Sequence, residues 1–165
     1  MRISMNRYFL LFAVLLCVAL AACKKGNDPA TQASVDDAKI QEYLRVNGIT
    51  DAKKDTSGLY YEVLAYGPNP NNPATFPTTV TDSMAKVSYS GKYLNGVIFN
   101  SQDITTFNLH NTIRGFTYGM RYINVGGRIR LFVPSRLAYG AAGTGDGGIP
   151  ANACVIFTCD LLGFY

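Results

Sequence analysis

Residues 125–162 read VGGRIRLFVPSRLAYGAAGTGDGGIPANACVIFTCDLL and join two strand patterns through a glycine-rich loop. In the first pattern Ile129, Leu131 and Val133 alternate with other residues, which predicts a strand with one face turned inward. Residues 153–165 are rich in β-branched and aromatic residues and predict a strand long enough to cross a whole sheet. Between them, five of the nine residues 140–148 are glycine, and the role of this loop is the first question that the sequence raises.

The loop does not match a nucleotide-binding loop. A phosphate-binding P-loop continues from its last glycine into Lys-Ser or Lys-Thr, whereas here Gly148 is followed by Ile149 and Pro150. A dinucleotide-binding loop opens a helix, but the residues after Pro150 lead into a predicted strand. Nucleotide is therefore not an expected ligand. Because Tyr139 and Ile149 bracket the loop, we interpret it as a flap over an apolar site and not as a solvated surface linker.

The remaining patterns predict an α+β fold with an antiparallel sheet and one short helix against a face of the sheet. Asn95-Gly96 is a strong hairpin signal between two of the strands. The expected elements are strands at 58–66, 85–94 and 97–101, a proline-rich loop at 67–83, and a short helix within 113–123.

A further helix is predicted over residues 34–48. Ser34 is a favourable N-cap, acidic residues occupy the first turn, and Gly48 is a stop signal. Its apolar side is imperfect and consists of Val35, Ala38, Tyr43 and Leu44. The helix is too short for a coiled coil of several heptads, so it is expected to act as a spacer or a docking element.

The N-terminus has the pattern of an export signal. Arg2 and Arg7 precede an apolar run over residues 8–22, which is shorter than the ~20 apolar residues expected of a membrane span. The run ends in Leu-Ala-Ala-Cys, which resembles the lipobox of bacterial lipoproteins and predicts that Cys23 is lipidated and becomes the first mature residue. An ordinary cleaved signal is the alternative. Residues 24–34 are small and polar and are interpreted as a flexible tether.

Charge and cysteine content exclude several other classes. The formal net charge is +4, and no basic run indicates a nucleic-acid partner. Cys154 and Cys159 lie five residues apart in one predicted strand, on opposite faces, and should therefore be too far apart for a disulfide. Their spacing also fits no zinc pattern, so both are expected to be free thiols and no metal site is predicted.

Three segments together resemble an FKBP-type peptidyl-prolyl isomerase domain. They are VSYSGKYLNGVIFNS (87–101), FNLHNTIRGFTYGM (107–120) and the opening stretch (125–162). The resemblance runs in order from about residue 58 to residue 162. It implies a half-wrapped antiparallel sheet of about five strands around one short helix, in agreement with the elements above. A lipid tether, a helix and this domain together resemble small exported lipoproteins of Gram-negative bacteria, especially Bacteroidetes.

The resemblance assigns the site residue by residue. Ile113 would offer its backbone N–H to a substrate carbonyl, Phe116 would form the floor under the proline ring, and Tyr139 would donate its hydroxyl. The implied catalytic set is Tyr89, Phe99, Asn100, Phe116, Tyr139 and Phe157, and the implied substrate-binding set is Phe107, Thr112, Ile113 and Ile149. His110 lies in a connecting segment and is interpreted as a surface or capping residue.

Three positions depart from the family pattern. Asn100 stands where the family usually has aspartate, Phe116 where it usually has tryptophan, and Thr112 where it usually has valine. These departures predict reduced activity on an intact fold.

The sequence therefore predicts three parts: a lipoprotein signal at 1–22, a lipid tether and spacer helix at 23–57, and an isomerase domain at 58–165. The resemblance implies isomerisation of proline-containing exported polypeptides in the cell envelope without a cofactor, and also implies macrolide immunosuppressant-type ligands. Lipidation predicts a membrane anchor, and Lys24 after the lipidated cysteine favours the outer membrane over inner-membrane retention. The alternative functions are a non-catalytic binding module of the same fold and a structural envelope protein.

Overall fold

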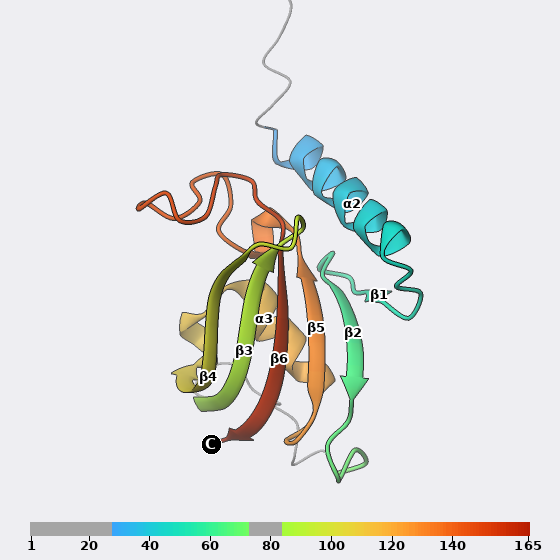
Figure 1. The fold of residues 1–165 in the computed structure, drawn as a ribbon, viewed down its shortest axis with the longest axis vertical. Coiled ribbons are helices and arrows are strands. Elements are labelled where there is room, and N and C mark those ends of the chain that lie inside the picture. The colour runs from blue at the N-terminus through green and yellow to red at the C-terminus, as the bar shows by residue number, and fades with distance from the viewer. Residues whose placement is uncertain (1–27, 73–83) are drawn as a thin grey trace, which may run out of the picture.

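The computed structural model describes residues 28–72 and 84–165 (Figure 1). The predicted signal sequence, Cys23 and the first residues of the tether lie outside the described residues, as does part of the proline-rich loop. The described chain forms a six-stranded sheet in the order β1-β2-β5-β6-β3-β4, with every pair of neighbours antiparallel. Its strands are β1 (Lys53–Lys54), β2 (Tyr60–Ala65), β3 (Met84–Tyr93), β4 (Ile98–Asn108), β5 (Arg128–Val133) and β6 (Val155–Phe164).

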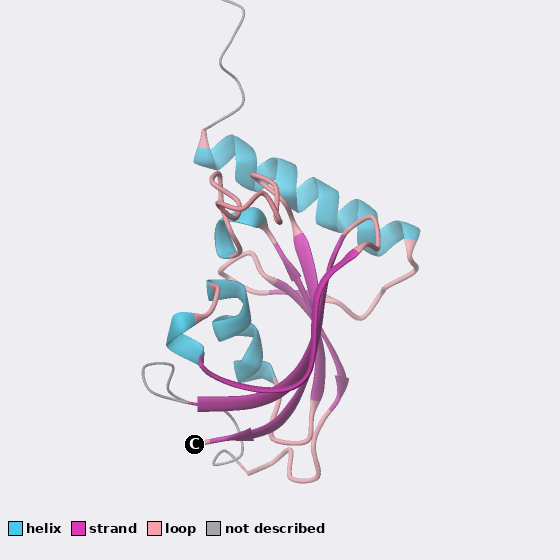
Figure 2. Cartoon of the chain, turned by 60° about the vertical axis from the view of Figure 1, so that its left-hand side comes forward, coloured by secondary structure: helices cyan, strands magenta, loops and turns pink. Residues whose placement is uncertain are grey.

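The helices are few and short apart from the first. They are α2 (Pro29–Val46), α3 (Arg114–Gly119) and the 3-10 turns η2 (Leu109–Asn111), η3 (Met120–Tyr122) and η4 (Ser135–Leu137). Figure 2 shows the sheet curving around α3, with α2 outside this curve. The predicted α+β class and half-wrapped antiparallel sheet are confirmed. The strand predicted at 97–101 is longer than expected, because β4 continues to Asn108 through pairing with β3.

The main core lies between the concave face of the sheet and α3. Ile129, Leu131 and Val133 of β5 are all 0% exposed and belong to this core, as their alternation predicts. The helix approaches β5 closely, because a Cβ at Gly115 would lie 2.3 Å from Val133 and one at Gly119 would lie 2.4 Å from Leu131. These two glycines therefore allow α3 to pack directly on the strand.

A second core lies on the other face of the sheet. Ile40 and Leu44, one turn apart on α2, pack there with the strand residues Tyr60, Phe132 and Ile156 and with Cys154. The helix therefore docks on the sheet, which is why Phe132 is fully buried although the inward-facing residues of β5 alternate with it. The predicted apolar side of the helix was wrong at Val35 and Ala38, which are exposed.

The start of α2 is also corrected. The helix begins at Pro29, with Asp28 as the N-cap accepting a hydrogen bond from the Ala30 N–H, and not at Ser34. Proline is favourable in the first turn, and an aspartate side chain is a favourable cap, so this pair forms a stronger start signal than Ser34. The last residues of the predicted tether are thus helical.

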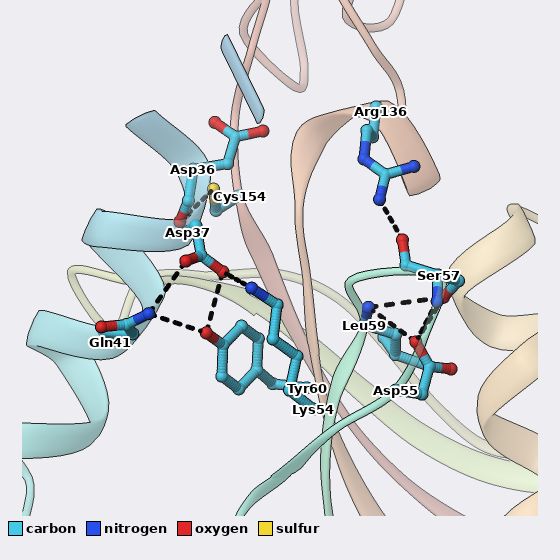
Figure 3. Close-up of polar contacts among 10 residues, drawn as sticks. All are labelled: Asp36, Asp37, Gln41, Lys54, Asp55, Ser57, Leu59, Tyr60, Arg136 and Cys154. Carbon is cyan, nitrogen blue, oxygen red and sulfur yellow. Dashed lines mark hydrogen bonds and ion pairs between the residues drawn. The ribbon is translucent and has the colours of Figure 1, made fainter. Parts of the chain in front are cut away.

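Polar contacts hold α2 against the first two strands (Figure 3). The Asp37 carboxylate pairs with Lys54 of β1 and accepts a hydrogen bond of 2.8 Å from the Tyr60 hydroxyl of β2. Gln41, one turn along the helix, donates to both Asp37 and Tyr60. The sheet begins at Lys53, before the predicted domain boundary at 58, and these contacts join the helix to it. Among the described helices, none is long and apolar enough to cross a membrane.

Cys154 and Cys159 are free and buried in the structure. Cys154 packs in the second core and Cys159 in the main core, so the two thiols face opposite sides of the sheet. Burial raises the pKa of the Cys154 thiol to about 12, with a contribution from Asp36, and it raises the pKa of Cys159 well above its ordinary value.

We expect both of these thiols to resist alkylation in the folded protein up to about pH 9. A raised pKa keeps the proton on the sulfur as pH rises, and the thiol form is a poor nucleophile. Iodoacetamide followed by mass spectrometry should add no label at Cys154 or Cys159 in buffer and should label both in denaturant without reductant. Labelling in buffer at the unfolded-state rate would contradict the burial, and failure to label in denaturant would indicate a disulfide.

Candidate functional site

An aromatic cluster occupies the concave face of the sheet. Phe116 of α3 lies at its centre, with its ring centroid 5.2 Å from that of Phe107, 5.8 Å from Phe157 and 6.1 Å from Tyr89. The ring centroids of Phe99 and Phe157 are 5.7 Å apart. The ring pairs are tilted or edge-on, the arrangement favoured by the quadrupoles of aromatic rings. The structure thus brings together five of the predicted site residues, from β3, β4, α3 and β6.

Irregularities in β3 help to place these rings. The pairing of β3 with β4 shifts register between Val87 and Tyr89 and again between Gly91 and Lys92. Such bulges re-aim side chains. Gly91 is buried, and a Cβ there would lie 2.8 Å from ring carbons of both Phe99 and Phe157. The Tyr-x-Gly pattern of the sequence therefore has a physical basis: glycine leaves the space in which the two rings meet.

The start of α3 supplies a polar group at the edge of this cluster. Ile113 is the N-cap residue of α3, and its carbonyl accepts the Phe116 and Thr117 N–H groups. Its own N–H has no acceptor in the part of the chain that the structure describes. The Thr112 hydroxyl donates to the Leu109 carbonyl at 2.7 Å and also lies 3.2 Å from the Thr117 hydroxyl. Thr112 therefore fixes the turn that presents the Ile113 N–H.

Ile149, at one end of the glycine loop, belongs to the main core that contains Phe116 and Phe157, and Tyr139, at the other end, packs against this core. Ile149 is 6% exposed, whereas Tyr139 is half-buried. Burial raises the pKa of Tyr139, and the neighbouring Tyr89 and Tyr93 add to the shift. Burial likewise raises the pKa of Tyr89, so both phenols remain protonated hydrogen-bond donors at neutral pH. Within the described residues neither hydroxyl has a hydrogen-bond partner.

The glycine loop has a defined conformation. Thr144 and Ile149 are joined by two hydrogen bonds, of 2.9 Å from the Thr144 N–H to the Ile149 carbonyl and of 2.7 Å from the Ile149 N–H to the Thr144 hydroxyl. Gly143 has a φ of +66°, and a Cβ there would lie 2.2 Å from the Ile149 carbonyl oxygen. The Asp146 carboxylate accepts from the Gly148 N–H at 3.0 Å. The loop can thus fold back on itself between Thr144 and Ile149 because glycine stands at its tightest point.

Tyr93 belongs to this site and was missed by the sequence analysis. Its ring lies 5.0 Å from that of Phe99, and its hydroxyl donates to the Gly148 carbonyl in the glycine loop. Tyr93 is four residues after Tyr89 in β3, so an alternating strand places both on one face. That spacing is the signal that could have identified it.

Two predicted assignments lie outside the cluster. Asn100 is exposed on β4, opposite Gly91 in the register, and its side chain makes no hydrogen bond within the described chain. Its predicted role at the pocket wall stays a prediction. His110 is exposed in η2, and only its backbone N–H makes a hydrogen bond, to Asn108, which agrees with a surface position. In the described residues, no group of histidine, cysteine and acidic side chains could hold a metal ion.

Within the described residues, the site is apolar and aromatic and has a backbone N–H and phenols without hydrogen-bond partners, which suits binding of an extended peptide. Residues 77–162 match the family model of the FKBP-type peptidyl-prolyl cis-trans isomerases. This match covers just over half of the chain. The chain belongs to this family. It is 37% identical over 129 residues to the FKBP-type isomerase FkpA of Aeromonas hydrophila, covering 75% of this chain and 45% of that protein.

A further relative and a solved structure are also similar to this chain. A macrophage infectivity potentiator of Trypanosoma cruzi is 34% identical over 116 residues, covering 68% of this chain and 56% of that protein. The crystal structure of FkpA from Escherichia coli aligns with a TM-score of 0.66 at 28% identity, covering 99% of this chain and 74% of that one. The chain spans about half the length of the curated relatives that it matches.

Proposed function

We propose that this FKBP-type domain catalyses cis-trans isomerisation of X-Pro peptide bonds in exported polypeptides. The observation that carries the proposal is the aromatic cluster around Phe116, bordered by an unpaired Ile113 N–H and an unpaired Tyr139 hydroxyl in the described chain. The cluster offers an apolar surface for a proline ring. We assign these two donors to the peptide carbonyls that adjoin the proline ring of a bound segment.

The chemistry requires neither a nucleophile nor a metal. Rotation about a peptide bond is opposed by a barrier of ~18–20 kcal/mol, because resonance gives the C–N bond partial double-bond character. In the rotational transition state the amide is twisted and its carbonyl is less dipolar. An aromatic site that excludes water favours this state over the planar amide, which is stabilised by hydration. Proline is the natural substrate, since its cis and trans forms are close in energy.

Each polar group has a defined part in this mechanism. The Ile113 N–H holds the carbonyl on the N-terminal side of the prolyl unit, and Phe116 supports the ring. Tyr139 donates to a second carbonyl, so the chain on one side of the bond is fixed while the other side rotates. Holding the substrate in this way contributes to rate by orientation.

A non-catalytic binding module of the same fold is the second candidate. Two features of position 100 favour it. The family usually has a carboxylate there, whereas this chain has asparagine, and the Asn100 side chain is exposed. A protease-coupled or exchange-NMR assay on a panel of X-Pro peptides distinguishes the two. Acceleration at catalytic protein concentrations, inhibited by a macrolide of the immunosuppressant type, supports the isomerase. Peptide binding without acceleration replaces the isomerase with the binding module.

We also propose that the protein acts at the cell envelope through a lipid on Cys23, with the outer membrane as its site. The proposal rests on the Leu-Ala-Ala-Cys sequence after a basic and apolar leader, and on Lys24 directly after the cysteine. Several acyl chains on one residue give stable anchoring where a single chain gives marginal binding.

The Cys23→Ala variant is therefore expected to move from the membrane fraction to the soluble fraction, or to accumulate as the uncleaved precursor. Without the thiol, no diacylglyceryl group can be attached. Fractionation followed by mass spectrometry of the N-terminus measures both outcomes, with Cys17→Ala as the matched control that should remain lipidated. Normal membrane partitioning of Cys23→Ala with a normally cleaved N-terminus would exclude the lipid anchor.

A further inference from the structure

We propose that Asp36 of α2 is a positioning residue for Tyr139. This inference rests on the proposed isomerase function, since it concerns the hydroxyl that we assign to the substrate. Asp36 lies outside residues 77–162, which match the family model, and it is 103 positions before Tyr139 in the chain. The N-terminal helix α2 thereby helps to position a residue of the site.

The Asp36 carboxylate is fully buried, at 0% exposure, between α2 and η4. One oxygen accepts two hydrogen bonds from Ser135, at 2.8 Å from its N–H and 2.6 Å from its hydroxyl. The other oxygen accepts from the Gln32 amide at 2.7 Å. In the part of the chain that the structure describes, no cation pairs with this carboxylate, so three hydrogen bonds alone satisfy it.

Ser135 in turn closes the turn that carries Tyr139. The Ser135 carbonyl accepts from the Ala138 N–H at 3.0 Å and from the Gly140 N–H at 2.8 Å. Tyr139 therefore lies between two amides that are both bonded to the same oxygen. Because the N–H and the hydroxyl of Ser135 are held by Asp36, its backbone cannot rotate without breaking charge-assisted bonds, which are about twice as strong as neutral ones.

Arg136, the next residue of η4, is also held by a segment that precedes the family match. Arg136 donates to the Ser57 carbonyl, in the segment just before β2 (Figure 3). That segment is closed by Asp55, whose carboxylate accepts from the N–H groups of Ser57 and Leu59. Two successive residues of η4 are thus fixed by parts of the chain that precede the family match.

Helix docking does not by itself account for Asp36. The adjacent Asp37 already joins α2 to Lys54 and Tyr60, and Ile40 and Leu44 supply the apolar contact. Asp36 is the member of this pair that contacts η4, whereas Asp37 contacts the strands. Asp37 therefore provides a matched control on the same helix.

The experiment compares Asp36→Ala, the conservative Asp36→Asn, and the control Asp37→Ala in the full chain. We expect Asp36→Ala to lower kcat/KM for an X-Pro peptide by about threefold to tenfold, no more than the loss of the Tyr139 hydroxyl itself, because a misplaced donor loses orientation. Asp36→Asn keeps an acceptor for Ser135 and should recover most of this loss. Asp37→Ala should leave kcat/KM unchanged. Amide hydrogen exchange at Ala138 and Gly140 should accelerate in Asp36→Ala and not in Asp37→Ala.

A double-mutant cycle identifies the route of the effect. If Asp36 acts through Tyr139, then Asp36→Ala should cause no further loss in a Tyr139→Phe background. An equal loss in both backgrounds, an equal loss from Asp36→Ala and Asp37→Ala, or unchanged exchange at Ala138 and Gly140 would overturn the proposal.

Ser135→Ala, which removes only the hydroxyl bond, replaces Asp36→Ala if that variant does not fold. An inactive wild type would refute the proposed function, and exchange at the two amides would then decide whether Asp36 holds the turn.

Discussion

The Phe116→Ala variant is expected to isomerise X-Pro peptides at least about a hundredfold more slowly than the wild type, equivalent to about 2.7 kcal/mol of lost transition-state stabilisation. Phe116 is 3% exposed and contacts Phe107, Phe157 and Tyr89 through its ring. Its removal deletes the surface for the proline ring and lets water into the site. The same change should lower the free energy of unfolding by about 3–5 kcal/mol, as large-to-small changes of buried aromatic residues do.

Phe132→Ala is the matched control for this loss of stability. Phe132 is 0% exposed and belongs to the second core, on the face of the sheet away from the aromatic cluster. We expect a comparable loss of unfolding free energy with kcat/KM, per folded molecule, close to that of the wild type. Urea denaturation gives the folded fraction, and the isomerase assay is run at urea concentrations well below the midpoint of unfolding. Equal loss of kcat/KM in the two variants would mean that Phe116 acts only through stability.

The sequence predicts the concave face of the sheet well and its other face poorly. Alternation identifies Ile129, Leu131 and Val133 because each strand has one face in the main core. The same rule assigns Phe132 to solvent, but α2 covers it. Whether a helix docks on a sheet depends on contacts between distant segments, and the one-turn pair of Ile40 and Leu44 is too short a pattern to show it.

The site likewise has a part that the sequence predicts and a part that it does not. The aromatic residues follow from the order of the family motifs, and the structure brings them together. Contacts that hold the site in place join residues far apart in the sequence: Tyr93 reaches Gly148 across 55 positions, and Asp36 reaches Ser135 across 99. No periodicity or motif links such pairs. They depend on how the loops lie over the finished sheet.

Glycine in the loop between β5 and β6 illustrates what a local pattern can establish. The glycine content predicts flexibility and a flap. The structure adds that Gly140, Gly143 and Gly147 adopt positive φ, whereas Gly145 does not. Substitution at Gly143 combines backbone strain with a clash against Ile149, while Gly145 has open space around it. The composition identifies the loop, but only the fold shows which of its glycines have a positive φ and which have no space for a side chain.

The Tyr139→Phe variant is expected to lower kcat/KM about threefold to tenfold, the range for one neutral hydrogen bond made to the substrate. The change should leave stability almost unaltered, because the hydroxyl is without a partner in the described chain and Tyr139 is only half-buried. Tyr118→Phe is the matched control, since Tyr118 is also half-buried and lies outside the ring contacts of the aromatic cluster. Equal activity of the two variants would remove Tyr139 from the mechanism.

The pH dependence provides an independent check on Tyr139. Burial raises its pKa above the ordinary value of about 10, so the phenol keeps its proton as pH rises through that value. Its contribution to rate is therefore fully present at neutral pH and is lost only as pH rises through the raised pKa. We expect kcat/KM to be level from about pH 6 to 9 in wild type and in Tyr139→Phe, with the ratio between them constant. A ratio that falls toward one below pH 9 would show an ionised phenolate and contradict the apolar setting of this hydroxyl.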